Sequence, residues 1–166
     1  MSERAKRIAQ NAGLLAGSLL LTFAVLELVV FRFILQPDDL LRNVTINGVV
    51  RYVPNSDAVF RHPDGRSTLV TINGDGWNSM HRRYQVQRMP GTLRIAVIGD
   101  SYVHGSFVDV HEGFPEVLER RLNAAGLRAE VFRFGMDGAP LSQYLHVLRR
   151  EVKAYKPDVV IVPLIH

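Results

Sequence analysis

The stretch Leu93–Gly105, LRIAVIGDSYVHG, decides the fold of this chain. Its first six residues are almost all aliphatic, which is typical of a strand buried on both faces of a parallel sheet. Gly99 then permits a tight turn that other residues would strain. The pattern predicts a strand that delivers Ser101 to a turn, and this makes Ser101 a candidate nucleophile.

The residues after this turn alternate between helical and strand patterns. Apolar residues recur at helical spacing in 113–125 and 141–155, a short strand is expected at 130–134, and an apolar strand is expected at 159–164. Such crossovers favour parallel pairing and right-handed connections. We therefore expect an α/β fold, a three-layer sandwich. In such sheets, binding and catalytic residues lie in the loops beyond the carboxyl ends of the strands. Here these are the loops at Ser101, at 135–138 and from His166 onward.

Over roughly residues 94–166 the chain resembles the SGNH (GDSL-type) hydrolase family, whose first block is Gly-Asp-Ser followed shortly by Gly, here Gly99-Asp100-Ser101 and Gly105. The resemblance implies a flavodoxin-like sandwich, partial in this chain, in which Ser101 attacks an ester carbonyl. It also implies that the backbone N–H groups of Ser101 and Gly138 form the oxyanion hole. Asp100 and Gly105 would shape the turn around the nucleophile. The resemblance to this family implies neither a cofactor nor a metal ion.

The family's third-block Asn and its Asp-x-x-His do not occur in this sequence. Either the chain is a fragment that lacks the C-terminal half, which we favour, or it is a short form that has lost catalysis. A serine needs a neighbouring base. His104 lies about one helical turn after Ser101 and is an alternative base, although a packing role is favoured for it, and His166 is interpreted as structural. Arg133 also departs from the family, which often has Asn ahead of the second-block glycines.

The N-terminal segment predicts one membrane-spanning helix. Residues 12–35 are apolar over about the length that crosses a bilayer, and Arg4, Lys6 and Arg7 precede them. A cationic flank favours a cytoplasmic N-terminus, residues 1–11, and a main domain outside the cytoplasm, in the periplasm. The alternative is a cleaved signal peptide, but the apolar run is long for one. We expect a single-pass anchor in the cell membrane.

Small residues and one carboxyl group within the span indicate a helical partner. Gly13 and Gly17 have the Gly-x-x-x-Gly spacing at which two helices approach closely in lipid. Glu27 is costly in hydrocarbon unless it is protonated, paired or turned toward protein. These three residues favour a helix–helix contact, which would place the protein in a membrane complex. The rest of the span is expected to contact the lipid bilayer.

Residues 36–92 read as a β-rich lead-in packed against the α/β domain, residues 93–166. Turn residues separate short β-like runs at 43–52 and 67–73. Membrane-anchored bacterial members of the SGNH family are similar here, with an Asn-x-x-Gly-(aromatic) phrase like 73–77. A lone Trp is more often part of a core, so Trp77 is expected to dock strands, with substrate contact as the alternative.

Composition excludes several classes of protein. There is no Cys, and the 20 basic and 16 acidic residues are not gathered into one stripe, which argues against nucleic-acid binding. Nucleotide-cradling and common zinc motifs are absent from the sequence.

Two functions follow. The first is a membrane-anchored, extracytoplasmic SGNH-type serine esterase or O-acyl (acetyl) hydrolase or transferase acting on cell-envelope glycan or lipid esters. The alternative is a non-catalytic accessory subunit of a larger membrane complex, held by its single helix, because a fold does not guarantee activity.

Overall fold

The structure is a computed structural model that describes residues 2–34 and 39–164. The chain divides into two compact units between residues 37 and 38. The expected end of the span at residue 35, the start of the lead-in and His166 lie outside the described residues.

The first unit is one long helix. The α-helix α1 (Glu3–Val25) begins after Ser2, whose hydroxyl accepts from the Ala5 N–H, and continues as a π-helix, η1 (Leu26–Ile34). The helix starts earlier than the apolar run because residues 3–11 are mostly good helix formers. Its 32 residues are long and apolar enough to cross a membrane, a test that a signal sequence also passes.

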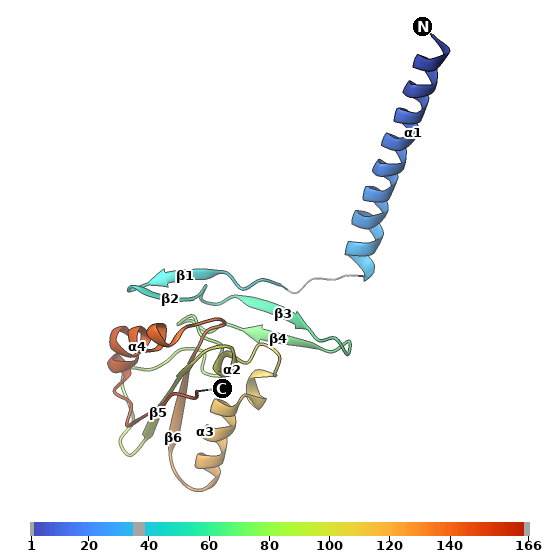
Figure 1. Cartoon of the computed structure of the whole chain (residues 1–166). Helices are drawn as coiled ribbons and strands as arrows, with labels where there is room; N and C mark the ends of the chain where they lie inside the picture. Colours follow the sequence, from blue (N-terminus) through green and yellow to red (C-terminus); the bar gives the residue numbers. More distant parts are fainter. Residues whose placement is uncertain (1, 35–38, 165–166) are drawn as a thin grey trace. The chain divides into compact units, whose positions relative to one another are not determined.

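A three-stranded parallel sheet forms the centre of the second unit. Its strands are β5 (Leu93–Gly99), β6 (Ala129–Gly135) and β7 (Val159–Ile161), in the order β6-β5-β7. The chain moves in opposite directions from β5 to β6 and from β6 to β7, so right-handed crossovers place their helices on opposite faces. Figure 1 shows α3 (Phe114–Ala124) and α4 (Leu141–Arg150) on the two sides of the sheet. The predicted α/β class with a parallel sheet is confirmed.

Alternate strand residues enter two separate cores, as the two-residue repeat of a strand requires. One face buries Ala96, Ile98, Phe132 and Phe134 against Tyr144 and Val147 of α4 and against Trp77 and Tyr84 of the lead-in. The other face buries Ile95, Val97 and Val131 against Leu118 and Leu122 of α3.

The lead-in consists of two antiparallel hairpins followed by a long irregular segment. The hairpins pair β1 (Asn43–Ile46) with β2 (Val49–Tyr52) and β3 (Asp57–Arg61) with β4 (Ser67–Thr71). Asn47 and Gly48, which join β1 to β2, both have positive φ, as the two-residue Asn-Gly hairpin turn requires. The lead-in and the α/β elements belong to one compact unit.

Three elements differ in extent from the sequence-based expectation. The β-like run expected over 43–52 is the β1–β2 hairpin and not one strand, because the Asn47-Gly48 turn divides it. The helix expected over 141–155 ends at Arg150 and resumes as a 3-10 turn, η3 (Val152–Tyr155), because Glu151 leaves the helical conformation at φ −128°. The strand expected over 159–164 forms ladder pairs only through Ile161. Two short helical turns, α2 (Ser101–His104) and η2 (Val110–Glu112), lie between β5 and α3.

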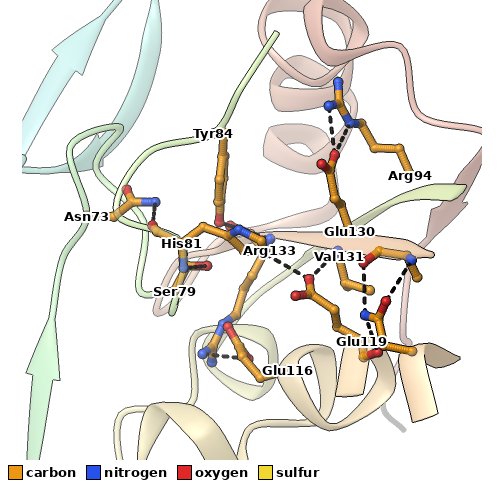
Figure 2. A network of polar contacts seen from close by, with 12 residues as sticks. Asn73, Ser79, His81, Tyr84, Arg94, Glu116, Glu119, Glu130, Val131 and Arg133 are labelled. Atoms are coloured by element: carbon orange, nitrogen blue, oxygen red, sulfur yellow. Dashed lines mark hydrogen bonds and ion pairs between the residues drawn. The ribbon is translucent and has the colours of Figure 1, made fainter. Parts of the chain in front are cut away.

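Side chains cap the outer edge of β6 (Figure 2). The Tyr84 hydroxyl accepts from the Arg133 N–H at 3.0 Å and donates to the Arg133 carbonyl at 2.6 Å. A carboxylate oxygen of Glu119 accepts from the Val131 N–H at 2.6 Å. These bonds satisfy backbone groups that would otherwise form an open strand edge.

Candidate active site

Ser101 lies one residue past the turn that ends the central strand. The Asp100 side chain accepts from the Tyr102 N–H at 3.1 Å and thereby caps α2. Ser101 is the first residue of α2 and is exposed to solvent. Its own N–H, in the first turn, has no partner within the helix. The helix ends at His104, and the next residue, Gly105, caps it with φ +67° and donates to the Ser101 carbonyl at 2.7 Å.

Two glycines bring α2 close to the sheet. Gly99 and Gly135 are paired at the last positions of β5 and β6. A Cβ on Gly99 would overlap the Val103 side chain, and one on Gly135 would overlap the backbone of Val103 and His104. The helix that carries Ser101 can therefore pack directly on the carboxyl ends of the two strands.

The loop after β6 holds Gly138. The Met136 N–H donates to the Gly99 carbonyl at 3.2 Å, so this loop begins beside the end of β5. The Ala139 N–H donates back to Met136 at 3.2 Å, and Gly138 within that turn has φ +70°. The Gly138 N–H makes no hydrogen bond within the described residues. Its part in an oxyanion hole with Ser101 stays a prediction.

His104 is buried and does not contact Ser101 through a hydrogen bond. Its exposed fraction is 0%, its ring lies 4.6 Å from that of Tyr52, and neither ring nitrogen has a hydrogen-bond partner in the described structure. Burial lowers the pKa of His104 to about 4, although Asp137, at 3.9 Å from Nε2, acts in the opposite direction, and Arg133 lowers it further. A general base must reach the proton that it removes. The structure favours the packing role of His104.

Four other histidines are described, and the rings of three of them have different partners, whereas His111 accepts from Arg120 through its backbone carbonyl. His62 is bonded to Thr68, His81 to Glu119 and His146 to the Gly48 carbonyl. Within residues 2–34 and 39–164, no histidine is hydrogen-bonded to Ser101, and no group of three or more His, Cys, Asp or Glu residues is placed to hold a metal ion.

Arg133 of β6 contacts both α2 and α3. Its guanidinium is buried, donates to the His104 carbonyl at 3.0 Å and pairs with Glu116 of α3 at 2.8 Å (Figure 2). Burial raises the pKa of Glu116, and Arg133 opposes that rise. Arg133 therefore joins α3 to the C-terminal carbonyl groups of α2. The sequence signal that could have indicated such a role is an arginine between two phenylalanines, Phe132 and Phe134, in the strand.

Trp77 belongs to the core of the lead-in. It is fully buried, and its indole N–H donates to Glu151 at 3.0 Å. The Asn73 side chain accepts from the Asp75 and Trp77 N–H groups and so shapes the loop before Trp77. Arg51 of β2 pairs with the same Glu151 at 2.7 Å. Burial places Trp77 in the docking role, and the alternative of substrate contact is not favoured.

A cavity of about 400 Å³ adjoins Ser101, and sequence reasoning did not reveal it. Its lining consists of Ser101, Tyr102, Gly105, Ser106, Phe107 and Val108. The volume is within the range of roughly 300–1,000 Å³ that is common for ligand sites. The signal available in the sequence is the cluster of large apolar residues just after a Gly-Asp-Ser turn.

No protein-family model matches the chain, and no curated protein matches it. Among solved structures, the chain is similar to the crystal structure of AlinE4, a SGNH-hydrolase family esterase, and to a point mutant of the same esterase. In both cases the identity is 26% and the TM-score 0.41, over 46% of this chain and 42% of the other. The matched region spans less than half the length of either solved chain.

Proposed function

We propose that Ser101 is the nucleophile of an SGNH-type serine esterase, or of an O-acyl hydrolase or transferase. One observation carries this proposal: an exposed serine stands at the carboxyl end of the central strand, with a capped turn beneath it and an apolar cavity beside it. Loops at this edge of a parallel sheet are the usual place for chemistry.

The reaction is acyl transfer through a serine ester. The Ser101 Oγ forms a bond to the acyl carbon while the ester C–O bond breaks, and the released alcohol receives the proton that the serine loses. Water, or a second alcohol in a transferase, then takes the acyl group from Ser101. The N–H groups of Ser101 and Gly138 would stabilise the negative oxygen of each intermediate. Among the described residues, no histidine is hydrogen-bonded to Ser101.

The substrate and the location are further parts of the same proposal. The apolar helix and the basic residues before it support a single-pass anchor with the second unit outside the cytoplasm. An esterase in that place would meet the esters of cell-envelope glycans or lipids.

Labelling with a fluorophosphonate probe tests the proposal in the full chain, purified in mild detergent. The expected adduct is on Ser101 and disappears in Ser101→Ala. Ser142→Ala is the matched control, because Ser142 is likewise an exposed serine in the first turn of a helix, α4, and does not line the cavity. Folded protein that carries no adduct on Ser101 would falsify the proposal.

The second candidate, a subunit of a membrane complex, depends on α1. Nothing lies within 4 Å of the position of a Cβ on Gly13 or Gly17, and no residue of α1 is buried. The face of α1 that carries Gly13 and Gly17 would allow the close approach of a second helix. Gly13→Leu and Gly17→Leu should then dissociate a complex that Thr22→Leu, on the opposite side at 100° per residue, leaves intact. A protein that remains monomeric in mild detergent would count against this candidate.

A further inference from the structure

A tyrosine of the lead-in holds the loop after β6. The Tyr52 hydroxyl, at the end of β2, accepts from the Asp137 N–H at 3.0 Å. Tyr52 is only 3% exposed, its own N–H donates to the Gly76 carbonyl at 3.2 Å, and its ring packs against that of His104. The hydroxyl therefore belongs to a fixed side chain, and it binds a residue 85 positions further along the chain.

A second hydrogen bond holds the side chain of the same aspartate. The Ser106 hydroxyl, in the segment after α2, donates to the Asp137 carboxylate at 3.0 Å. Burial raises the pKa of Tyr52 well above its ordinary value, and the charge of Asp137 raises it further, although the bond from the Asp137 N–H acts in the opposite direction. The Tyr52 hydroxyl thus stays protonated at neutral pH. Asp137 is fixed at its nitrogen by β2 and at its carboxylate by the segment after α2.

Asp137 and Gly138 are the two central residues of a type II turn. The turn is closed by the bond from the Ala139 N–H to the Met136 carbonyl at 3.2 Å. Gly138 has φ +70°, whereas the φ of Asp137 is not positive, and this combination defines type II. In turns of types I and II, the peptide group between the central residues points to opposite sides. Here that peptide group carries the Gly138 N–H.

The direction of the Gly138 N–H therefore depends on how Asp137 is held. Both central residues of the turn are exposed, so packing restrains them little. Glycine at position 138 favours type II, because φ is positive there. The bonds from Tyr52 and Ser106 add a tertiary restraint, since they fix Asp137 on the near side of the peptide group that would have to rotate.

We propose that Tyr52 is a positioning residue for the esterase reaction, which orients the Gly138 N–H toward the negative oxygen of the tetrahedral intermediate through its bond to Asp137. The inference rests on the proposed function, since it requires Ser101 to attack an ester. It gives the lead-in a role in catalysis besides the docking of strands. Because the negative charge develops only on the way to the intermediate, a misdirected N–H should lower kcat and leave KM nearly unchanged.

Tyr52→Phe tests this role, because it removes the hydroxyl and keeps the ring in the core. With p-nitrophenyl acetate and the full chain in mild detergent, we expect kcat to fall at least about tenfold, a part of the roughly 100- to 1,000-fold loss that follows removal of one oxyanion donor. KM should stay the same. Tyr155→Phe is the matched control and should leave kcat unchanged. Tyr155 is a buried tyrosine of the same apolar core, and its hydroxyl makes no hydrogen bond among the described residues.

A double variant separates positioning from a general effect on folding. Gly138→Ala places its Cβ in open space but disfavours the positive φ of the turn, so it should lower kcat by itself. If Tyr52 acts through this N–H, the double variant Tyr52→Phe/Gly138→Ala should lower kcat no further than the larger single effect, whereas independent effects would multiply. Hydrogen exchange at the Asp137 amide needs no activity and should be faster in Tyr52→Phe than in Tyr155→Phe.

Fluorophosphonate labelling of the unmodified protein distinguishes this inference from the esterase proposal. An adduct on Ser101, with a fall in kcat for Tyr52→Phe that does not multiply in the double variant, supports the positioning role. An adduct together with unchanged kcat in Tyr52→Phe, multiplied effects, a change in KM alone or unchanged exchange at Asp137 overturns the positioning role and leaves the esterase proposal standing. Folded protein without an adduct on Ser101 overturns both.

Discussion

Gly99 and Gly135 form the last pair of the β5–β6 ladder, and α2 packs against both of them. The place where a Cβ of Gly135 would stand is occupied by the backbone of Val103 and His104. Because backbone atoms cannot rotate away as a side chain can, the approach of α2 depends on the absence of a side chain at this position.

Gly135→Ala should therefore destabilise the second unit by about 1–3 kcal/mol, the usual cost of overpacking. Urea denaturation followed by tryptophan fluorescence measures the effect, since Trp77 lies in that unit. Gly17→Ala is the control, because its Cβ would meet no atom within 4 Å. Equal midpoints for the two variants would show that α2 is seated more loosely than the structure indicates.

Replacing His104 should make the protein less sensitive to acid. Its folded pKa, about 4, lies below the usual histidine value of 6.5, so the unfolded chain binds the proton more readily between these two values. Stability is complete above about pH 6.5 and falls as the pH decreases toward 4, by up to about 1.4 kcal/mol per pH unit.

His104→Phe keeps the ring in the core and removes the titration. Because neither nitrogen of His104 has a partner in the described structure, the variant should be at least as stable as the parent at pH 7. The difference in unfolding free energy between the two proteins, measured from pH 7 to pH 4.5, should widen in favour of the variant. Carboxyl groups that do not interact with His104 titrate in both proteins and cancel in this difference, whereas Asp137, 3.9 Å from His104 Nε2, belongs to the measured effect. Parallel curves would contradict the prediction.

Breaking the buried pair between Arg51 and Glu151 should be costly. Both side chains are less than a tenth exposed, and Glu151 also accepts from Trp77. Glu151→Leu would leave the guanidinium buried without its carboxylate, which typically costs about 3–5 kcal/mol. The double variant Arg51→Met/Glu151→Leu should recover much of this loss, as measured by denaturant unfolding. Asp64→Asn, which breaks an exposed pair with Arg66, is the control and should leave the unfolding midpoint unchanged.

Tyr84→Phe should open the edge of β6. The variant removes the hydroxyl that serves both backbone groups of Arg133, and unsatisfied buried groups cost about 1–3 kcal/mol. We also expect faster hydrogen exchange at the Arg133 amide. Tyr102→Phe is the control, since Tyr102 is exposed and its hydroxyl makes no hydrogen bond among the described residues. Unchanged exchange at Arg133 would mean that another group protects this edge.

The main elements of the α/β region could be predicted because their signals are local. The aliphatic run of β5 and the helical spacing within α3 and α4 each lie inside one segment, and their alternation implies a parallel sheet. The strand β3 was missed because Asp57–Arg61 has polar ends and a short apolar centre. The break at Glu151 was missed because it coincides with partners that lie 74 and 100 residues away, Trp77 and Arg51.

For the candidate site, too, some features could be predicted from the sequence and others could not. The Gly-Asp-Ser turn identifies Ser101 in the sequence. No residue next to Phe107 in the sequence indicates that its ring packs against those of Phe60 and His62. Arg133 stands between Phe132 and Phe134 in β6, but its partner Glu116 comes from α3. His104 could face solvent or core from its spacing alone.

The sequence by itself determined where the main strands and helices of the α/β region form, where the turn that presents Ser101 falls, and which helix could enter a membrane, because periodicity and turn chemistry act over a few residues. Only the tertiary structure decided that His104 is buried, that Arg133 joins α3 to α2, and that an apolar cavity adjoins Ser101. Burial, ion pairing and cavity shape depend on residues far apart in the chain, and these meet only when the sheet and its covering layers have formed.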